Sequence, residues 1–170
     1  MMAEMRTGQV QRRVAASAGA GLAAVVALIA ANLAIIAGIV TIVRRNPALG
    51  ARVLKRYNAL TLPTAGRRFS VYSVLEHTGR RSGRTYFTPV GAYQFGDGFV
   101  IGLTYGSTVD WCRNVVASGN GVLRWRGQSY PLERPEIIPL DPHVLRAFPL
   151  PFRSILAREL SRCLWLHRAP

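Results

Sequence analysis

The chain begins with a long apolar segment. No charged residue occurs in Val14–Val43, where Leu, Ile, Val and Ala predominate. A helix of about 30 residues rises ~45 Å, more than the ~30 Å of a bilayer core. The pattern therefore predicts an N-terminal transmembrane helix, so that residues 1–45 form a membrane anchor. Basic pairs flank the segment (Arg12–Arg13 and Arg44–Arg45), and a cleaved signal peptide is the alternative interpretation.

The next residues predict a short basic helix. Asn46–Pro47 is typical of a helix start, with a capping side chain followed by proline. Apolar residues then recur at helical spacing, while Arg52, Lys55 and Arg56 occupy other faces. Residues 46–69 are therefore expected to form an amphipathic helix and connector that lies on anionic headgroups or docks on the following domain. This cluster of positive charge after the span predicts a cytoplasmic location for the rest of the chain.

From Ser70 the pattern changes to alternating positions and short apolar runs punctuated by glycine. The spacing predicts one short helix among several strands and turns: strands over 70–76, 85–95 and 99–104, a basic turn over 77–84, a helix over 110–117, and a hairpin of 122–126 with 129–132. Residues 70–140 are thus expected to form a small antiparallel β-barrel. Residues 141–170 are expected to form a helical tail that starts at Asp141–Pro142 and ends in the Leu- and Arg-rich segment 152–166.

Composition adds a strong positive charge to this picture. The chain has 22 basic and 8 acidic residues, a formal net charge of +14. That excess favours an anionic partner, which is a nucleic acid, an anionic lipid, or a small molecule bearing phosphate or carboxylate. Two cysteines and three histidines show no metal-ligand spacing, so no metal site is expected. The sequence motifs of serine hydrolases, P-loop NTPases and HExxH metalloproteases do not occur.

Three segments carry residue types suited to binding a ligand. The turn Gly79–Arg84 combines glycines with guanidinium and hydroxyl donors, a combination that suits phosphate or carboxylate groups; its alternative is a solvated turn. Thr88–Pro89 marks an edge strand or a bulge, because proline lacks the N–H of a ladder. In the short helix, Asp110 can cap the N-terminus, and Trp111 and Asn114 share a face. Trp111 could stack beside a flat heterocycle or simply pack in the core.

The ordered set of these segments resembles a known family. Thr78–Arg84 (TGRRSGR), then Thr88–Val90 (TPV), then Tyr105–Asn114 (YGSTVDWCRN) are similar to motifs of the F420-dependent nitroreductase and quinone reductase family of actinobacteria, as is the upstream Ala65–Arg67 (AGR). The resemblance covers residues 70–139. It implies a split β-barrel that binds the deazaflavin coenzyme F420, with flavin mononucleotide not excluded.

The resemblance also implies roles for individual residues. Arg80, Arg81 and Ser82, with Arg84 nearby, would hold the phosphate and the tail carboxylates. The ring site would be lined by the remaining residues of the predicted site: Thr88, Pro89, Gly102, Leu103, Thr104, Tyr105, Trp111 and Asn114. No catalytic side chain is expected, because the coenzyme itself carries the hydride.

The function expected from this resemblance and from the predicted anchor is hydride transfer between F420 and a hydrophobic acceptor, such as a quinone, by a membrane-tethered oxidoreductase. Tyr72, Thr104, Tyr105 and the apolar tail are the candidates for the acceptor side. One alternative is a non-catalytic protein that binds F420 or a fatty acyl chain. Another is nucleic-acid binding, which is disfavoured because the aromatic residues are not arrayed at alternating strand positions.

Overall fold

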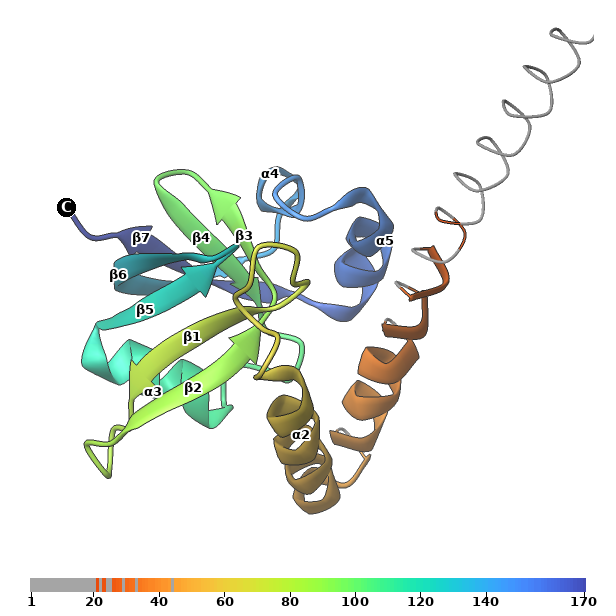
Figure 1. Cartoon of the computed structure of the whole chain (residues 1–170), viewed down its shortest axis with the longest axis horizontal. Coiled ribbons are helices and arrows are strands. Elements are labelled where there is room, and N and C mark those ends of the chain that lie inside the picture. The colour runs from red at the N-terminus through yellow and green to blue at the C-terminus, as the bar shows by residue number, and fades with distance from the viewer. Residues whose placement is uncertain (1–20, 22, 24–25, 29, 33, 44) are drawn as a thin grey trace, which may run out of the picture. The chain divides into compact units, whose positions relative to one another are not determined.

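The structure is a computed structural model that describes residues 21, 23, 26–28, 30–32, 34–43 and 45–170. The chain divides into two compact units, Met1–Gly50 and Ala51–Pro170 (Figure 1). The basic residues expected on the N-terminal side of the span, Arg12–Arg13 among them, and Arg44 lie outside the described residues.

Among its described residues, the first unit has one helix that is long and apolar enough to cross a membrane. Its span, Val26–Val43, has a mean hydropathy of 2.6 over 18 residues. Length and composition agree equally with a signal sequence. Helix α2 (Pro47–Thr61) then begins where Asn46 and Pro47 predict, and Asn46 Oδ1 accepts a hydrogen bond from the N–H of Leu49 at 3.1 Å.

The second unit is built on seven antiparallel strands in the order β2-β1-β5-β6-β7-β4-β3. The sheet curls into a half-barrel with helices around it (Figure 1). The mainly β, α+β fold class is therefore confirmed at that level. The strands are β1 (Ser73–Thr78), β2 (Thr85–Val90), β3 (Ala92–Phe95), β4 (Gly98–Gly102), β5 (Asn120–Trp125), β6 (Gln128–Pro139) and β7 (Arg162–Arg168).

Two expected features of the strands are confirmed and one is corrected. β2 is an edge strand, which explains how Pro89 is accommodated opposite Val74 without disturbing the ladder. Gly96 adopts φ 55° in the turn between β3 and β4, as the hairpin prediction requires. The single strand expected over 85–95 is instead two strands, β2 and β3, which lie at opposite edges of the sheet and are separated by Gly91.

The prediction that residues 141–170 form a helical tail is wrong for the last part of the chain, which is a strand. Helices α4 (Pro142–Leu145) and α5 (Leu150–Glu159) do form, and Asp141 caps α4 by accepting the N–H of Val144 at 2.8 Å. The remainder, however, is strand β7, which lies between β6 and β4 inside the sheet. Because both faces of β7 are covered, its sequence is a nearly continuous apolar run without the alternation that marks a half-exposed strand.

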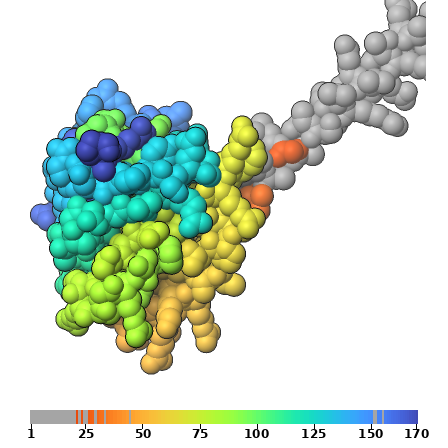
Figure 2. All heavy atoms as spheres, turned by 60° about the vertical axis from the view of Figure 1, so that its left-hand side comes forward, coloured from red at the N-terminus to blue at the C-terminus, as the bar shows by residue number. Residues whose placement is uncertain are grey.

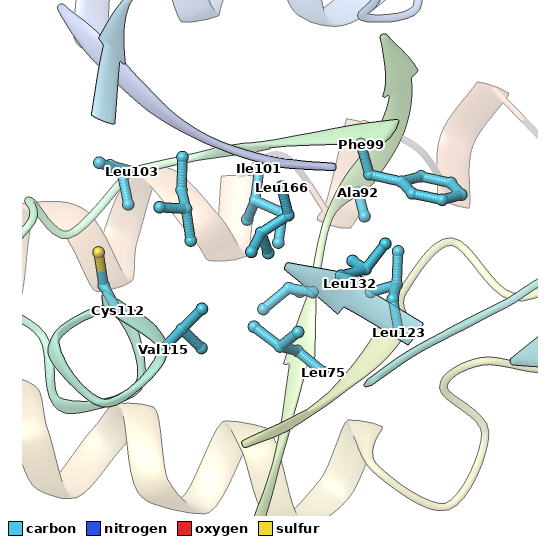
Figure 3. Close-up of a cluster of buried hydrophobic side chains, with 12 residues drawn as sticks. Leu75, Ala92, Phe99, Ile101, Leu103, Cys112, Val115, Leu123, Leu132 and Leu166 are labelled. Atoms are coloured by element: carbon cyan, nitrogen blue, oxygen red, sulfur yellow. The ribbon is translucent and has the colours of Figure 1, made fainter. Parts of the chain in front are cut away.

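Strands β4 and β7 separate two hydrophobic clusters. On β4, Phe99 and Ile101 belong to the larger cluster, whereas Val100 points to a smaller one with Phe148 of the α4–α5 connection. Neighbouring side chains on a strand face opposite sides, so each strand contributes to both clusters. The larger cluster lies between the sheet and helix α3 (Asp110–Ser118), which contributes Cys112 and Val115 (Figure 3).

Candidate functional site

The turn between β1 and β2 is closed by its own glycines. The N–H of Gly79 donates to the carbonyl of Arg84 at 2.8 Å, and the N–H of Gly83 donates to the carbonyl of Gly79 at 2.8 Å. Gly83 has φ 64°, a conformation that favours glycine. Ser82 Oγ accepts the N–H of Arg84 at 3.3 Å and lies 3.2 Å from the hydroxyl of Tyr86. The turn therefore has a defined shape before any ligand binds.

Arg80 fastens this turn to helix α3. Its Nη2 lies 2.9 Å from Asp110 Oδ1, and its Nη1 donates to Asn114 Oδ1 at 2.8 Å. The N–H of Arg80 also donates to Asn114 Oδ1, at 3.2 Å. The Arg80 side chain is only 22% exposed, so its guanidinium is largely engaged by the protein itself. The structure thus brings together the turn Gly79–Arg84 and the helix that carries Trp111 and Asn114, two of the three segments expected to bind a ligand.

A chain of hydrogen bonds continues from Asn114 into the sheet. Because Asn114 Oδ1 accepts from Arg80, its amide nitrogen faces His77 Nδ1, at 3.3 Å. An amide nitrogen only donates, so Nδ1 accepts and the ring proton sits on Nε2. That Nε2–H donates to Thr88 Oγ1 at 3.0 Å. The hydroxyl of Thr88 is left able to donate a hydrogen bond of its own.

The His77 ring, between Asn114 and Thr88 in this series of hydrogen bonds, is neutral. His77 is buried, with 4% of its surface exposed, and burial lowers the pKa of its ring from 6.5 to about 4. Its ring stacks on Tyr86 with centroids 5.9 Å apart. His77 was not among the expected site residues, although it alternates with buried Leu75 along β1 and directly precedes the Thr78–Gly79 motif. Period-two alternation would have placed it inward.

Helix α3 differs from expectation at its first residue. Asp110 does not cap it: Val109 is the N-cap residue and makes no side-chain capping bond, while the Asp110 carboxylate pairs with Arg80. Trp111 is half-buried and packs against the larger hydrophobic cluster, which is the core-packing alternative of the sequence analysis. Cys112 is fully buried, and burial raises the pKa of its thiol.

Two arginines of the turn have their charge available. Arg81 and Arg84 are exposed, and no ion pair of either is seen within residues 45–170. Ser82 is exposed beside them. Guanidinium groups without a carboxylate partner, on a turn of fixed shape, can bind an anionic group with charge-assisted hydrogen bonds.

The residues expected to line the ring site fall into two groups. Thr88 and Pro89 lie on β2, and Thr88 belongs to the hydrogen-bond chain. The second group comprises the last residue of β4 and the three residues after it: Gly102, Leu103, Thr104 and Tyr105. None of the four makes a described hydrogen bond to Arg80, Asn114, His77 or Thr88. The structure therefore joins the Gly79–Arg84 turn to Thr88 and α3 through hydrogen bonds, and no described hydrogen bond ties the end of β4 to them.

A tyrosine cluster accompanies the β4 end. Burial, with a smaller contribution from Tyr57, raises the pKa of Tyr105 to about 12, so its hydroxyl stays protonated. The hydroxyls of Tyr57 and Tyr72 are 2.8 Å apart, and their rings pack edge to face with centroids 6.2 Å apart. Of the expected acceptor-side residues, Tyr72 and Tyr105 thus lie with Tyr57, which sequence reasoning missed because its helical spacing marked only an amphipathic face.

Comparisons with known proteins give likeness in structure alone. No protein-family model matches the chain, and no curated protein does. The chain is similar in structure to an F420-H2 dependent reductase. That structure, FDR-A, is 14% identical with a TM-score of 0.42, over 57% of this chain and 94% of the other. The conserved hypothetical protein Rv2991 from Mycobacterium tuberculosis is 11% identical with a TM-score of 0.40, over 61% of this chain and 74% of its own. Likenesses at this level assign no activity and no site residue.

Proposed function

We propose that the protein is a membrane-tethered oxidoreductase that transfers hydride between coenzyme F420 and a hydrophobic acceptor such as a quinone. The observation that carries this proposal is the contact of Arg80 with Asp110 and Asn114, because it brings the anion-binding turn and the Trp111–Asn114 helix, 30 residues apart, to one place. The order of motifs along the chain favours F420 as the ligand of that place.

The residues of the turn fit the anionic end of such a coenzyme. Arg81 and Arg84 supply free guanidinium donors, and the Ser82 hydroxyl supplies a neutral one. Arg80 has a different role: its pairing with Asp110 holds the turn against α3, so that the free donors are positioned. Flavin mononucleotide also carries a phosphate, and a screen of both cofactors on one preparation decides between them.

The other residues then serve the ring and the acceptor. F420 supplies the hydride when it is bound, so the chain needs only to orient it and exclude water. The Thr88 hydroxyl, with its acceptor side occupied by His77, presents a donor, and the protonated Tyr105 hydroxyl presents another. The candidate span Val26–Val43 would keep the domain near the bilayer in which quinones dissolve, on its cytoplasmic side.

Fluorescence quenching of F420 by the full chain in detergent with added lipid tests the proposal. We expect binding, and we expect the double variant Arg81→Gln/Arg84→Gln to bind at least about tenfold more weakly, because each charged hydrogen bond contributes roughly 1.5–3 kcal/mol. Arg158→Gln, at an exposed position of α5, is a matched control for loss of charge and should bind like the wild type. Absence of quenching, or equal binding by the double variant, contradicts the assignment.

A non-catalytic binder of F420 or lipid is the second candidate. The observation in its favour is that His77, buried and bonded to Asn114 and Thr88, has a pKa lowered to about 4, so it is not available as an imidazolium acid at neutral pH. Oxidation of reduced F420 across a panel of quinones and enones separates the two candidates. Binding without turnover of any acceptor would favour the binder.

A further inference from the structure

The connector between α2 and β1 exposes apolar side chains that a soluble surface seldom shows. Phe69 is 93% exposed, the largest value among the large hydrophobic residues of the described chain, and Val71 two positions later is 58% exposed. An aromatic ring in this position gains nothing from the protein core. Exposed apolar groups of this kind mark contact surfaces.

Exposed arginines lie where this connector meets the β5–β6 hairpin. The N–H of Gly127, in the β5–β6 hairpin, donates to the carbonyl of Gly66 at 2.7 Å, so the hairpin and the connector lie side by side. A Cβ on Gly66 would stand 3.2 Å from the side chain of Arg124. Figure 2 shows the connector (yellow) at the surface beside the hairpin (cyan). Each segment has two exposed arginines next to this contact: Arg67, Arg68, Arg124 and Arg126.

This surface carries no compensating negative charge of its own. Residues 62–72 and 124–128 contain no Asp or Glu, and no ion pair of the four arginines is seen in the described chain. Two guanidinium groups lie over aromatic rings instead: Arg68 over Phe69 at 5.6 Å, and Arg126 over Trp125 at 4.5 Å. Arginine side chains, which carry a guanidinium group at the end of an apolar chain, and an exposed Phe69 ring are suited to the boundary between lipid headgroups and acyl chains.

We propose that this surface, the Phe69 patch (Arg67, Arg68, Phe69, Val71, Arg124 and Arg126), docks on an anionic bilayer. The aromatic ring and Val71 enter the headgroup region while the four guanidinium groups bind lipid phosphates. The inference rests on the membrane tether of the proposed function. The domain begins at Ala51, eight residues after the candidate span ends, and eight residues reach at most ~29 Å. Single-stranded nucleic acid fits less well, because it requires a row of stacking aromatics.

A fluorescent label beside the patch tests the docking. Ser70→Cys keeps Phe69 and introduces a thiol on the connector, and both native cysteines are fully buried, so an environment-sensitive dye labels the new site. Asn120→Cys is the matched control: it is exposed on the same strand as Trp125 but five residues away, ~17 Å along β5. The labelled full chain is placed in vesicles of phosphatidylcholine with or without phosphatidylglycerol, and quenching by nitroxide-bearing lipid is measured.

We expect quenching at position 70 in the anionic vesicles, much less in neutral vesicles or high salt, and little at position 120. Arg67→Gln and Arg68→Gln should each lower the docked-to-free ratio roughly fivefold, and Phe69→Ser should lower it further, whereas Arg158→Gln should not. Equal responses at positions 70 and 120, or none at 70, overturn the docking surface.

Flotation of the vesicles separates the possible failures. If the protein floats with the vesicles but the label at position 70 does not respond, the membrane tether is supported and the docking of the Phe69 patch is refuted. If the protein does not float, both the tether and the docking are refuted. F420 binding, measured separately in detergent, is independent of either result. Binding of single-stranded RNA that is lost in Arg67→Gln, without a lipid response, would assign the patch to nucleic acid and overturn the proposal.

Discussion

Replacing His77 by glutamine tests the direction of the hydrogen-bond chain through the candidate site. The neutral ring accepts from Asn114 at Nδ1 (3.3 Å) and donates to Thr88 from Nε2 (3.0 Å). Glutamine also offers one acceptor, its amide oxygen, and one donor nitrogen, and it does not gain a proton as the pH falls. His77→Gln can therefore keep the polar contacts while removing the titration.

The magnitude follows from the pKa of His77, which burial lowers from 6.5 to about 4. That lowering corresponds to about 3 kcal/mol in favour of the neutral ring in the folded state. As the pH falls below 6.5, the unfolded chain takes up the proton first, so the free energy of unfolding decreases. The contribution of neutral His77 to the free energy of unfolding is complete above pH 6.5 and is lost by the time the pH reaches about 4. The wild type should lose about 3 kcal/mol across that window through His77, and His77→Gln should lose none of it.

Urea unfolding of the full chain in detergent, followed by tryptophan fluorescence at several pH values in this window, measures the difference. Nitrogen-15 NMR of the imidazole reports the tautomer and the pKa directly. Equal pH slopes for the two proteins, a ring that titrates near its ordinary value, or a proton found on Nδ1 at neutral pH would each refute the reasoning.

Three further predictions concern stability. Asn114→Ala removes the bonds to Arg80 and to the imidazole, and should lower the free energy of unfolding by about 3 kcal/mol in urea titrations. Gly98→Ala places a Cβ 1.9 Å from a carbonyl oxygen of β7 and should cost about 3 kcal/mol or more, whereas Gly83→Ala, in open space at φ 64°, should cost only about 1 kcal/mol; thermal unfolding compares them. The hydrogen bond with His167 lowers the pKa of the Asp97 carboxyl below 3.8, so this carboxylate stabilises the fold above that pH and the stabilisation is lost as the pH falls through the lowered pKa. In Asp97→Asn the free energy of unfolding should therefore depend less on pH below 3.8, and unfolding curves at low pH check this.

Part of the candidate site could be predicted from the residue types and their order in the sequence. The glycine and arginine pattern of Gly79–Arg84 correctly indicated a shaped, cationic turn, because both properties are local. Sequence reasoning assigned Arg80 to the ligand, whereas the structure shows its guanidinium bonded to Asp110 and Asn114. Those partners lie 30 or more residues away, and no local pattern reveals which carboxylate a given arginine will meet.

The sequence by itself determined the local features of the protein: the apolar span, the start of α2 at Asn46–Pro47, the hairpin at Gly96, and an edge or a bulge at Pro89. Each depends on residues close in the chain, since capping, turn conformations and a missing N–H act over a few positions. Only the tertiary structure decided that 162–168 is an inner strand and that the His77 ring is neutral. Both depend on what covers the residue, because burial on two faces erases alternation and desolvation sets the protonation state.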